Sequence, residues 1–161
     1  MKVYLDNGST SFPKPKVVAD SIYNYLTNIG GNPGRSNHSN ALQANRSLYI
    51  TREEICDLFN YDKPENVIFT NNITSSLNIL LNGVIKPGDH VITSSMEHNS
   101  VIRPLYNLKN LLNIELDIVN ANTLGIVNVT DIEKLIKPNT KLLVMTHASN
   151  VSGSIQPIKQ I

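Results

Sequence analysis

Residues 86–119 read KPGDHVITSSMEHNSVIRPLYNLKNLLNIELDIV, and their pattern of apolar residues indicates the fold class. Residues 86–89 have the composition of a turn, and the short apolar run 90–93 after them predicts a strand. Apolar residues then recur at helical spacing over 101–112, and a second apolar run at 114–119 predicts another strand. A strand, a helix and a strand in succession are typical of a βαβ unit in a parallel sheet.

The same alternation continues on both sides of this unit. Helices are predicted at 18–29, which Gly30-Gly31 ends, and at 41–59. A third helix is predicted at 77–84, with Leu77, Leu80, Leu81 and Val84 as one buried face, and a fourth begins at a capping box, Thr130–Glu133. Strands are predicted at 67–69 and 142–145. We therefore predict an α/β fold, a three-layer αβα arrangement with a mostly parallel sheet. We expect the strands ending near Phe69, Thr93 and Met145 to share that sheet, so that the polar loops after them converge on one crevice.

The composition favours one globular domain. The 161 residues carry 14 Lys and Arg against 13 Asp and Glu, a net charge of +1, and 40% of them are hydrophobic. The chain has no run of Lys or Arg and no stretch of about 18 apolar residues, so we expect neither a nucleic acid nor a membrane as partner. The first six residues lack the apolar run of a secretion signal, and we expect a cytoplasmic protein.

Cysteine and histidine usage gives no indication of a metal site. Cys56 is the only cysteine, which excludes an internal disulfide and a cysteine-based cluster, and its place on an apolar helix face favours packing. The four histidines are too scattered along the chain to form a zinc motif. We therefore predict no metal centre.

The loop 70–76 is a candidate anion site. It precedes a predicted helix, whose first backbone N–H groups and positive dipole end suit a phosphate, and Thr74 and Ser75 add hydroxyl donors. An ordinary Thr or Ser N-cap is the alternative, and from this loop alone it is the favoured one. The loop is not a Walker motif, because no Gly-Lys-Ser/Thr follows it.

His98 and Arg35 are the other candidates for direct chemistry. An imidazole after a strand can stack on an aromatic ligand or shuttle protons as a catalytic residue, although a capping or surface histidine is the alternative. Arg35 lies in a Gly/Pro-rich loop between two predicted helices, where its guanidinium could clamp a substrate carboxylate. An exposed arginine in a flexible linker is the alternative there.

Five ordered motifs resemble a known family. They are YLDNGST at 4–10, GNPGR at 31–35, FTNNIT at 69–74, MEHN at 96–99 and HASNVSG at 147–153. The chain resembles class V aminotransferases over its whole length, and specifically the branch of cysteine desulfurases and selenocysteine lyases. This resemblance implies a pyridoxal 5′-phosphate enzyme of fold type I.

The resemblance also implies roles for individual residues. Thr74, with backbone N–H groups of Ile73 and Ser75, would hold the cofactor phosphate, His98 would stack on the pyridine ring, and Asn150 would bond its phenolic oxygen. Asn7, Arg35 and His38 would border the substrate pocket. Residues 1–14 would border the active site, and 15–161 would form the N-terminal part of the cofactor-binding large domain.

The implied reaction removes sulfur from cysteine or selenium from selenocysteine and leaves alanine. A sulfur-acceptor protein and a homodimer are implied partners. Members of the family are more than twice as long, and their Schiff-base lysine, pyridine-pairing aspartate and mobile-loop cysteine lie beyond the position of Ile161. We therefore expect a fragment that is inactive alone. A class V aminotransferase, another pyridoxal-phosphate-dependent lyase and a non-catalytic fragment are the alternatives.

Overall fold

A computed structural model describes residues 3–34 and 37–161 of the chain. It has two compact units, which divide between Phe69 and Thr70. No helix among the described residues has the length and apolar composition needed to cross a membrane.

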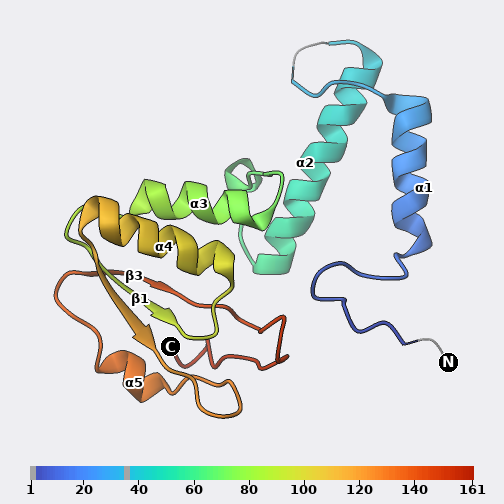
Figure 1. Ribbon diagram of the computed structural model, residues 1–161. Coiled ribbons are helices and arrows are strands. Elements are labelled where there is room, and N and C mark those ends of the chain that lie inside the picture. Colours follow the sequence, from blue (N-terminus) through green and yellow to red (C-terminus); the bar gives the residue numbers. More distant parts are fainter. Residues whose placement is uncertain (1–2, 35–36) are drawn as a thin grey trace. The chain divides into compact units, whose positions relative to one another are not determined.

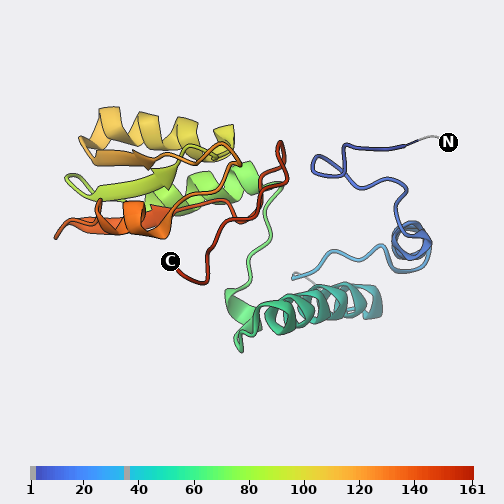
Figure 2. The same ribbon diagram turned by 90° about the horizontal axis from the view of Figure 1, so that it is seen from below.

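The second unit is an α/β structure. In chain order it contains α3 (Ile73–Val84), β1 (His90–Ser94), α4 (Asn99–Leu112), β2 (Glu115–Val119), α5 (Val129–Glu133) and β3 (Thr140–Val144). The three strands form one sheet in the order β2-β1-β3, and both pairings are parallel. Helices α3 and α4 cover one face of the sheet and α5 lies on the other (Figures 1 and 2). The predicted three-layer αβα arrangement with a parallel sheet is confirmed.

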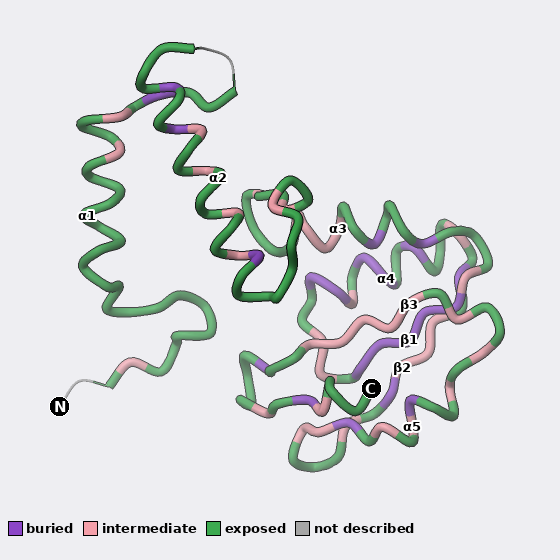
Figure 3. The backbone as a smooth tube through the Cα atoms, turned by 180° about the vertical axis from the view of Figure 1, so that it is seen from behind, coloured by how far each residue is buried: buried purple, intermediate pink, exposed green. Residues whose placement is uncertain are grey.

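The core of this unit lies on both faces of the sheet. The larger cluster joins α3 and α4 to β1 through Leu81, Ile85, Val91, Leu105 and Leu108, all at most 3% exposed. A smaller cluster packs α5 against the opposite face. Every residue of β1 is buried, because this central strand has a neighbour on each side and a layer on each face (Figure 3).

The first unit is helical. It contains α1 (Lys16–Asn24), a π-helical turn (Tyr25–Ile29), α2 (Ser39–Phe59) and a short 3₁₀ turn (Pro64–Asn66). The glycine stop is confirmed: Gly30 adopts a left-handed φ of 52°, and a Cβ on Gly31 would lie 2.2 Å from the Asn40 carbonyl oxygen. None of the nine residues of α1 is buried, so its apolar stripe has no partner among the described residues.

Three details of the prediction are wrong. Residues 67–69 form no strand, because no described segment pairs with them and a strand needs a neighbour for its backbone groups. The cap of α5 is Asn128, whose side chain accepts from the Thr130 N–H at 3.1 Å, and the Thr130 hydroxyl also donates to it. On α3, Leu81 is buried but Leu80 is 52% exposed, so the predicted apolar face is only partly covered.

Candidate functional site

Of the predicted site residues in the second unit, His98 and Asn150 lie on loops that follow the carboxyl ends of parallel strands, whereas Ile73, Thr74 and Ser75 begin α3. His98 follows β1, and Asn150 follows β3. Glu97 ties these two loops together, because its Oε1 accepts from the Ser94 hydroxyl at 2.8 Å and from the Thr146 N–H at 2.6 Å. In parallel α/β sheets, ligands bind outside the carboxyl ends of the strands, which is where these two loops lie.

The start of α3 offers free backbone donors. Among the described residues, no acceptor faces the N–H groups of Ile73 and Thr74, and the Thr74 side chain is exposed. The N–H group of Ser75 is already used: it donates to Oδ1 of the capping residue Asn72 at 2.8 Å, and the Ser75 hydroxyl donates to the same oxygen at 3.1 Å. Of the four predicted donors, the Ile73 N–H and the Thr74 hydroxyl are therefore available to an anion, and both donors of Ser75 are occupied by Asn72.

His98 is the N-cap of α4. Its Nδ1 accepts from the Ser100 N–H at 3.1 Å and lies 2.9 Å from the Ser100 hydroxyl. Because Nδ1 accepts a backbone proton, the neutral ring carries its own proton on Nε2. The cap uses one ring nitrogen and fixes the ring, but it leaves the ring face available for stacking.

Thr74 and His98 line the same cavity, which has a volume of about 410 Å³. Its remaining wall comes from α3 and α4, namely Asn78, Asn99, Ser100, Arg103, Pro104 and Asn107. No carboxylate lines it, and Arg103 is its one fully charged cation among the described residues. The donors, the charge and the aromatic ring fit a phosphate-bearing heterocycle. Arg103 was missed by the sequence analysis, because an arginine on an amphipathic helix normally lies on the solvated face.

Asn150 is not among the residues that line this cavity. It lies on the loop after β3, and its side chain is exposed. The loop is folded tightly beside it: the Ser149 hydroxyl oxygen accepts from the N–H groups of Val151 and Ser152, both at 3.2 Å. The predicted contact of Asn150 with a ligand oxygen stays a prediction.

The predicted substrate-pocket residues belong to the first unit. Asn7 holds a turn, since its Oδ1 accepts from the Phe12 N–H at 3.2 Å. His38 is the N-cap of α2, and its Nδ1 accepts from the Ala41 N–H at 3.3 Å. Arg35 lies outside the described residues. The role of these three residues at a substrate stays a prediction.

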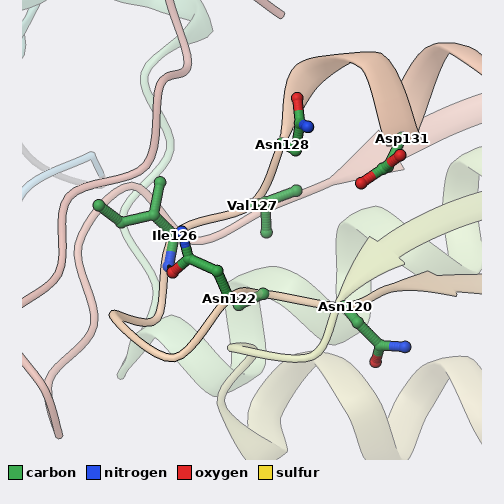
Figure 4. Close-up of a pocket in the computed structure, with 7 residues that line it drawn as sticks. Asn120, Asn122, Ile126, Val127, Asn128 and Asp131 are labelled. Carbon is green, nitrogen blue, oxygen red and sulfur yellow. Dashed lines mark hydrogen bonds between the residues drawn. The ribbon is translucent and has the colours of Figure 1, made fainter.

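Another cavity, with a volume of about 450 Å³, lies elsewhere in the second unit (Figure 4). Its walls are Asn120, Ala121, Asn122, Ile126, Val127, Asn128 and Asp131. Their polar groups serve the fold: Asn122 and Asn128 accept backbone N–H groups of their own turns, and Asp131 pairs with Lys134 at 2.7 Å. No predicted site residue lines it, so we do not assign it to the chemistry. Within the part of the chain that is described, no group of His, Cys, Asp and Glu side chains could hold a metal ion.

Comparison with known proteins shows what the chain is similar to. The model of the family described as aminotransferase class-V matches residues 3–161. A probable cysteine desulfurase of Borreliella burgdorferi is 34% identical over 99% of this chain and 39% of its own length. Cysteine desulfurase IscS of Photorhabdus laumondii is 32% identical over all of this chain and 41% of its own length.

Solved structures agree with these sequence matches. The apo structure of cysteine desulfurase from Thermococcus onnurineus has a TM-score of 0.89 at 30% identity and covers 98% of this chain and 40% of that one. SspA in complex with cysteine has a TM-score of 0.87 at 27% identity, over 99% of this chain and 46% of that one. The chain thus spans about two fifths of the length of the relatives it matches.

Proposed function

We propose, because this chain belongs to the aminotransferase class-V family, that it forms the N-terminal part of a cysteine desulfurase that uses pyridoxal 5′-phosphate. The observation that carries the proposal is the cavity that both Thr74, at the start of α3, and His98, the N-cap of α4, line. The names of the relatives support cysteine as the substrate.

The start of α3 is the proposed phosphate site. The N–H groups of Ile73 and Thr74 and the Thr74 hydroxyl lie at the N-terminal, positive end of a 12-residue helix. Ser75 joins them once Asn72 releases its N–H group. Arg103 adds a positive charge on the wall of the same cavity, which suits a phosphate dianion.

His98 is the proposed platform for the pyridine ring. Its cap to Ser100 holds the imidazole in one orientation, so that stacking costs little side-chain entropy. The proton on Nε2 can also serve a proton transfer at the cavity. Asn150 is proposed to donate a hydrogen bond from its amide to the phenolic oxygen of the cofactor.

When bound, pyridoxal phosphate supplies an electron-withdrawing ring that stabilises negative charge on the α-carbon of an amino acid. The expected products from cysteine are alanine and a sulfur atom carried by an acceptor thiol. Asn7, Arg35 and His38 are proposed to border the substrate, which is the role that the resemblance gives to residues 1–14 and to the loop before α2. A homodimer and a sulfur-acceptor protein are further parts of this proposal.

The test is an assay of the complete protein that contains this chain. With added pyridoxal phosphate and cysteine, we expect sulfide, in the presence of a reducing thiol, and alanine in equal amounts. The His98→Ala variant should retain the cofactor less well and turn over more slowly, because ring stacking contributes roughly 0.5–1.5 kcal/mol beyond burial. Amino-group transfer to a 2-oxo acid without sulfide release would contradict desulfuration and indicate an aminotransferase.

A further inference from the structure

Gln156 is buried and fully bonded, although sequence analysis gave it no role. It is 2% exposed, and its amide reaches the backbone of a segment about 30 residues earlier in the chain. Its Oε1 accepts from the Val127 N–H at 3.0 Å, and its Nε2 donates to the Gly125 carbonyl oxygen at 2.7 Å. Its own backbone N–H donates to the His147 carbonyl oxygen at 2.8 Å. Gln156 therefore joins two loops of the second unit.

The first of these loops is the brace hairpin, residues 121–127. An antiparallel bridge between Ala121 and Val127 closes it, and Oδ1 of Asn122 accepts from the N–H groups of Leu124 and Ile126 inside it. The Ala121 N–H donates to the Ser95 hydroxyl at 2.9 Å, which fixes the hairpin to the end of β1. The brace hairpin is thus a rigid support attached to the sheet.

The second loop is the Asn150 loop, residues 147–156. An antiparallel bridge between Ala148 and Ile155 closes its base, and the Ser149 N–H donates to the Ser154 carbonyl oxygen at 2.9 Å. Asn150 lies at the tip, beyond these bonds, and Gln156 lies at the base. Because the loop is internally bonded, its base and its tip move together.

The two loops also touch through Gly125. This glycine has a left-handed φ of 74°, and a Cβ on it would lie 3.0 Å from both the Met96 Cε and the Ser154 Oγ. The brace hairpin is therefore packed between the loop after β1, which carries His98, and the Asn150 loop. A change at this contact shifts the Asn150 loop relative to the loop after β1.

We propose that Gln156 is a positioning residue that clamps the Asn150 loop to the brace hairpin and so sets where the Asn150 amide meets the phenolic oxygen of the cofactor. The inference rests on the proposed function. Removing the clamp leaves the Val127 N–H unpaired at a buried position and the Gly125 carbonyl unpaired at a half-buried one, so the loop must shift to admit water. Misplacement of a binding group by about 1 Å is enough to weaken a reaction by roughly a hundredfold.

The test uses the complete protein loaded with pyridoxal phosphate. It measures the midpoint, which is the pH at which the visible absorption of the bound cofactor has completed half of its change with pH. A hydrogen bond from Asn150 favours the unprotonated phenolic oxygen, so Asn150→Ala should raise this midpoint. Gln156→Leu should raise it as well, and the double variant should show no further rise beyond Asn150→Ala. Gln160→Leu is the matched control, because Gln160 is exposed and lies in the same segment.

A second measurement does not need the cofactor. Hydrogen exchange of the Val127 amide and of the amides at 149–154 should speed up in Gln156→Leu and stay unchanged in Gln160→Leu. If Gln156→Leu does not fold, Gly125→Ala pushes on the same contact without deleting a bond, and the same rise in the midpoint is expected.

The outcomes separate the two proposals. A Gln156→Leu variant that melts at a lower temperature but keeps the wild-type midpoint has lost only structural support, and this result overturns the positioning role. If Gly125→Ala is measured in place of Gln156→Leu, an unchanged midpoint likewise overturns the positioning role. A wild-type protein that binds no pyridoxal phosphate overturns the proposed function instead.

Discussion

Three side chains cap the starts of α2, α3 and α4 in this protein, and two of them belong to residues that are proposed to contact a ligand. For His98 the sequence left a cap and a stacking ring as alternatives, and the structure uses the ring edge for the cap. His38 caps α2 in the same way. For the start of α3 the cap is Asn72, a residue whose type and position are a recognised N-cap signal that the sequence analysis did not use.

Asn72→Gly tests whether the Asn72 side chain competes with the phosphate. Its Oδ1 occupies the Ser75 N–H, so removing the side chain should free a donor for the anion. A charge-assisted hydrogen bond contributes about 1.5–3 kcal/mol, so we expect pyridoxal phosphate to bind about tenfold more tightly. The helix itself should lose only a few tenths of a kcal/mol, because glycine is an acceptable N-cap.

The matched control is Asn128→Gly, which removes the same kind of cap from α5. It should leave the affinity for pyridoxal phosphate unchanged. If Asn72→Gly binds the cofactor more weakly than the wild type, then Asn72 donates to the phosphate and does not compete with it.

At the scale of elements, long periodic helices and central strands could be predicted and isolated apolar runs could not. The helix over 41–59 and the strand at 90–93 have patterns that local sequence determines. The run 67–69 has the same composition as a strand, but whether it becomes one depends on a neighbouring strand, which a local pattern does not contain. For the same reason, the meeting of Thr74 with Arg103 depends on how α3 packs beside α4.

A charged network holds the amino ends of the three strands together. His90 is fully buried, its Nε2 lies 3.1 Å from Asp117 Oδ2, and its Nδ1 lies 2.7 Å from the Thr140 hydroxyl. Lys137 Nζ lies 2.9 Å from carboxylate oxygens of both Asp117 and Glu115. Hydrogen bonds from Lys137 lower the pKa of both carboxyl groups below their ordinary values.

This network predicts loss of stability in acid. Because the folded-state pKa values of Glu115 and Asp117 are lowered, their contribution is present above their ordinary pKa values of 4.5 and 3.8 and is lost as pH falls through the lowered values. We expect the melting temperature to fall between about pH 5 and pH 2. The fall should be smaller in Lys137→Met.

Lys134→Met is the control for this series, because Lys134 pairs with Asp131 on the exposed surface. It should follow the pH dependence of the wild type. If the melting temperature falls with pH equally in the wild type and in Lys137→Met, the charged network is not the cause of the acid sensitivity.

At the scale of the whole molecule, the two units differ in how much of their apolar surface is covered. The second unit has a buried cluster on each face of its sheet, whereas the first buries only Gly31, Ala41, Ala44 and Cys56 among its described residues. Amphipathic patterning predicted α1 and α2 correctly, but the partner of an apolar face is a tertiary property that patterning does not specify. The α/β class of the second unit could be predicted because strand and helix alternate along the chain there.

We expect the start of α3 to bind the phosphate group of pyridoxal phosphate. The most direct test measures the dissociation constants of pyridoxal and of pyridoxal phosphate for the complete protein. The wild type should prefer the phosphorylated form. Thr74→Val should reduce this preference by about tenfold, since it deletes a hydrogen bond to a charged group, and should leave the affinity for pyridoxal unchanged. The control Thr51→Val, on α2, should keep the wild-type preference. A Thr74→Val protein with an undiminished preference for the phosphorylated form would contradict the account.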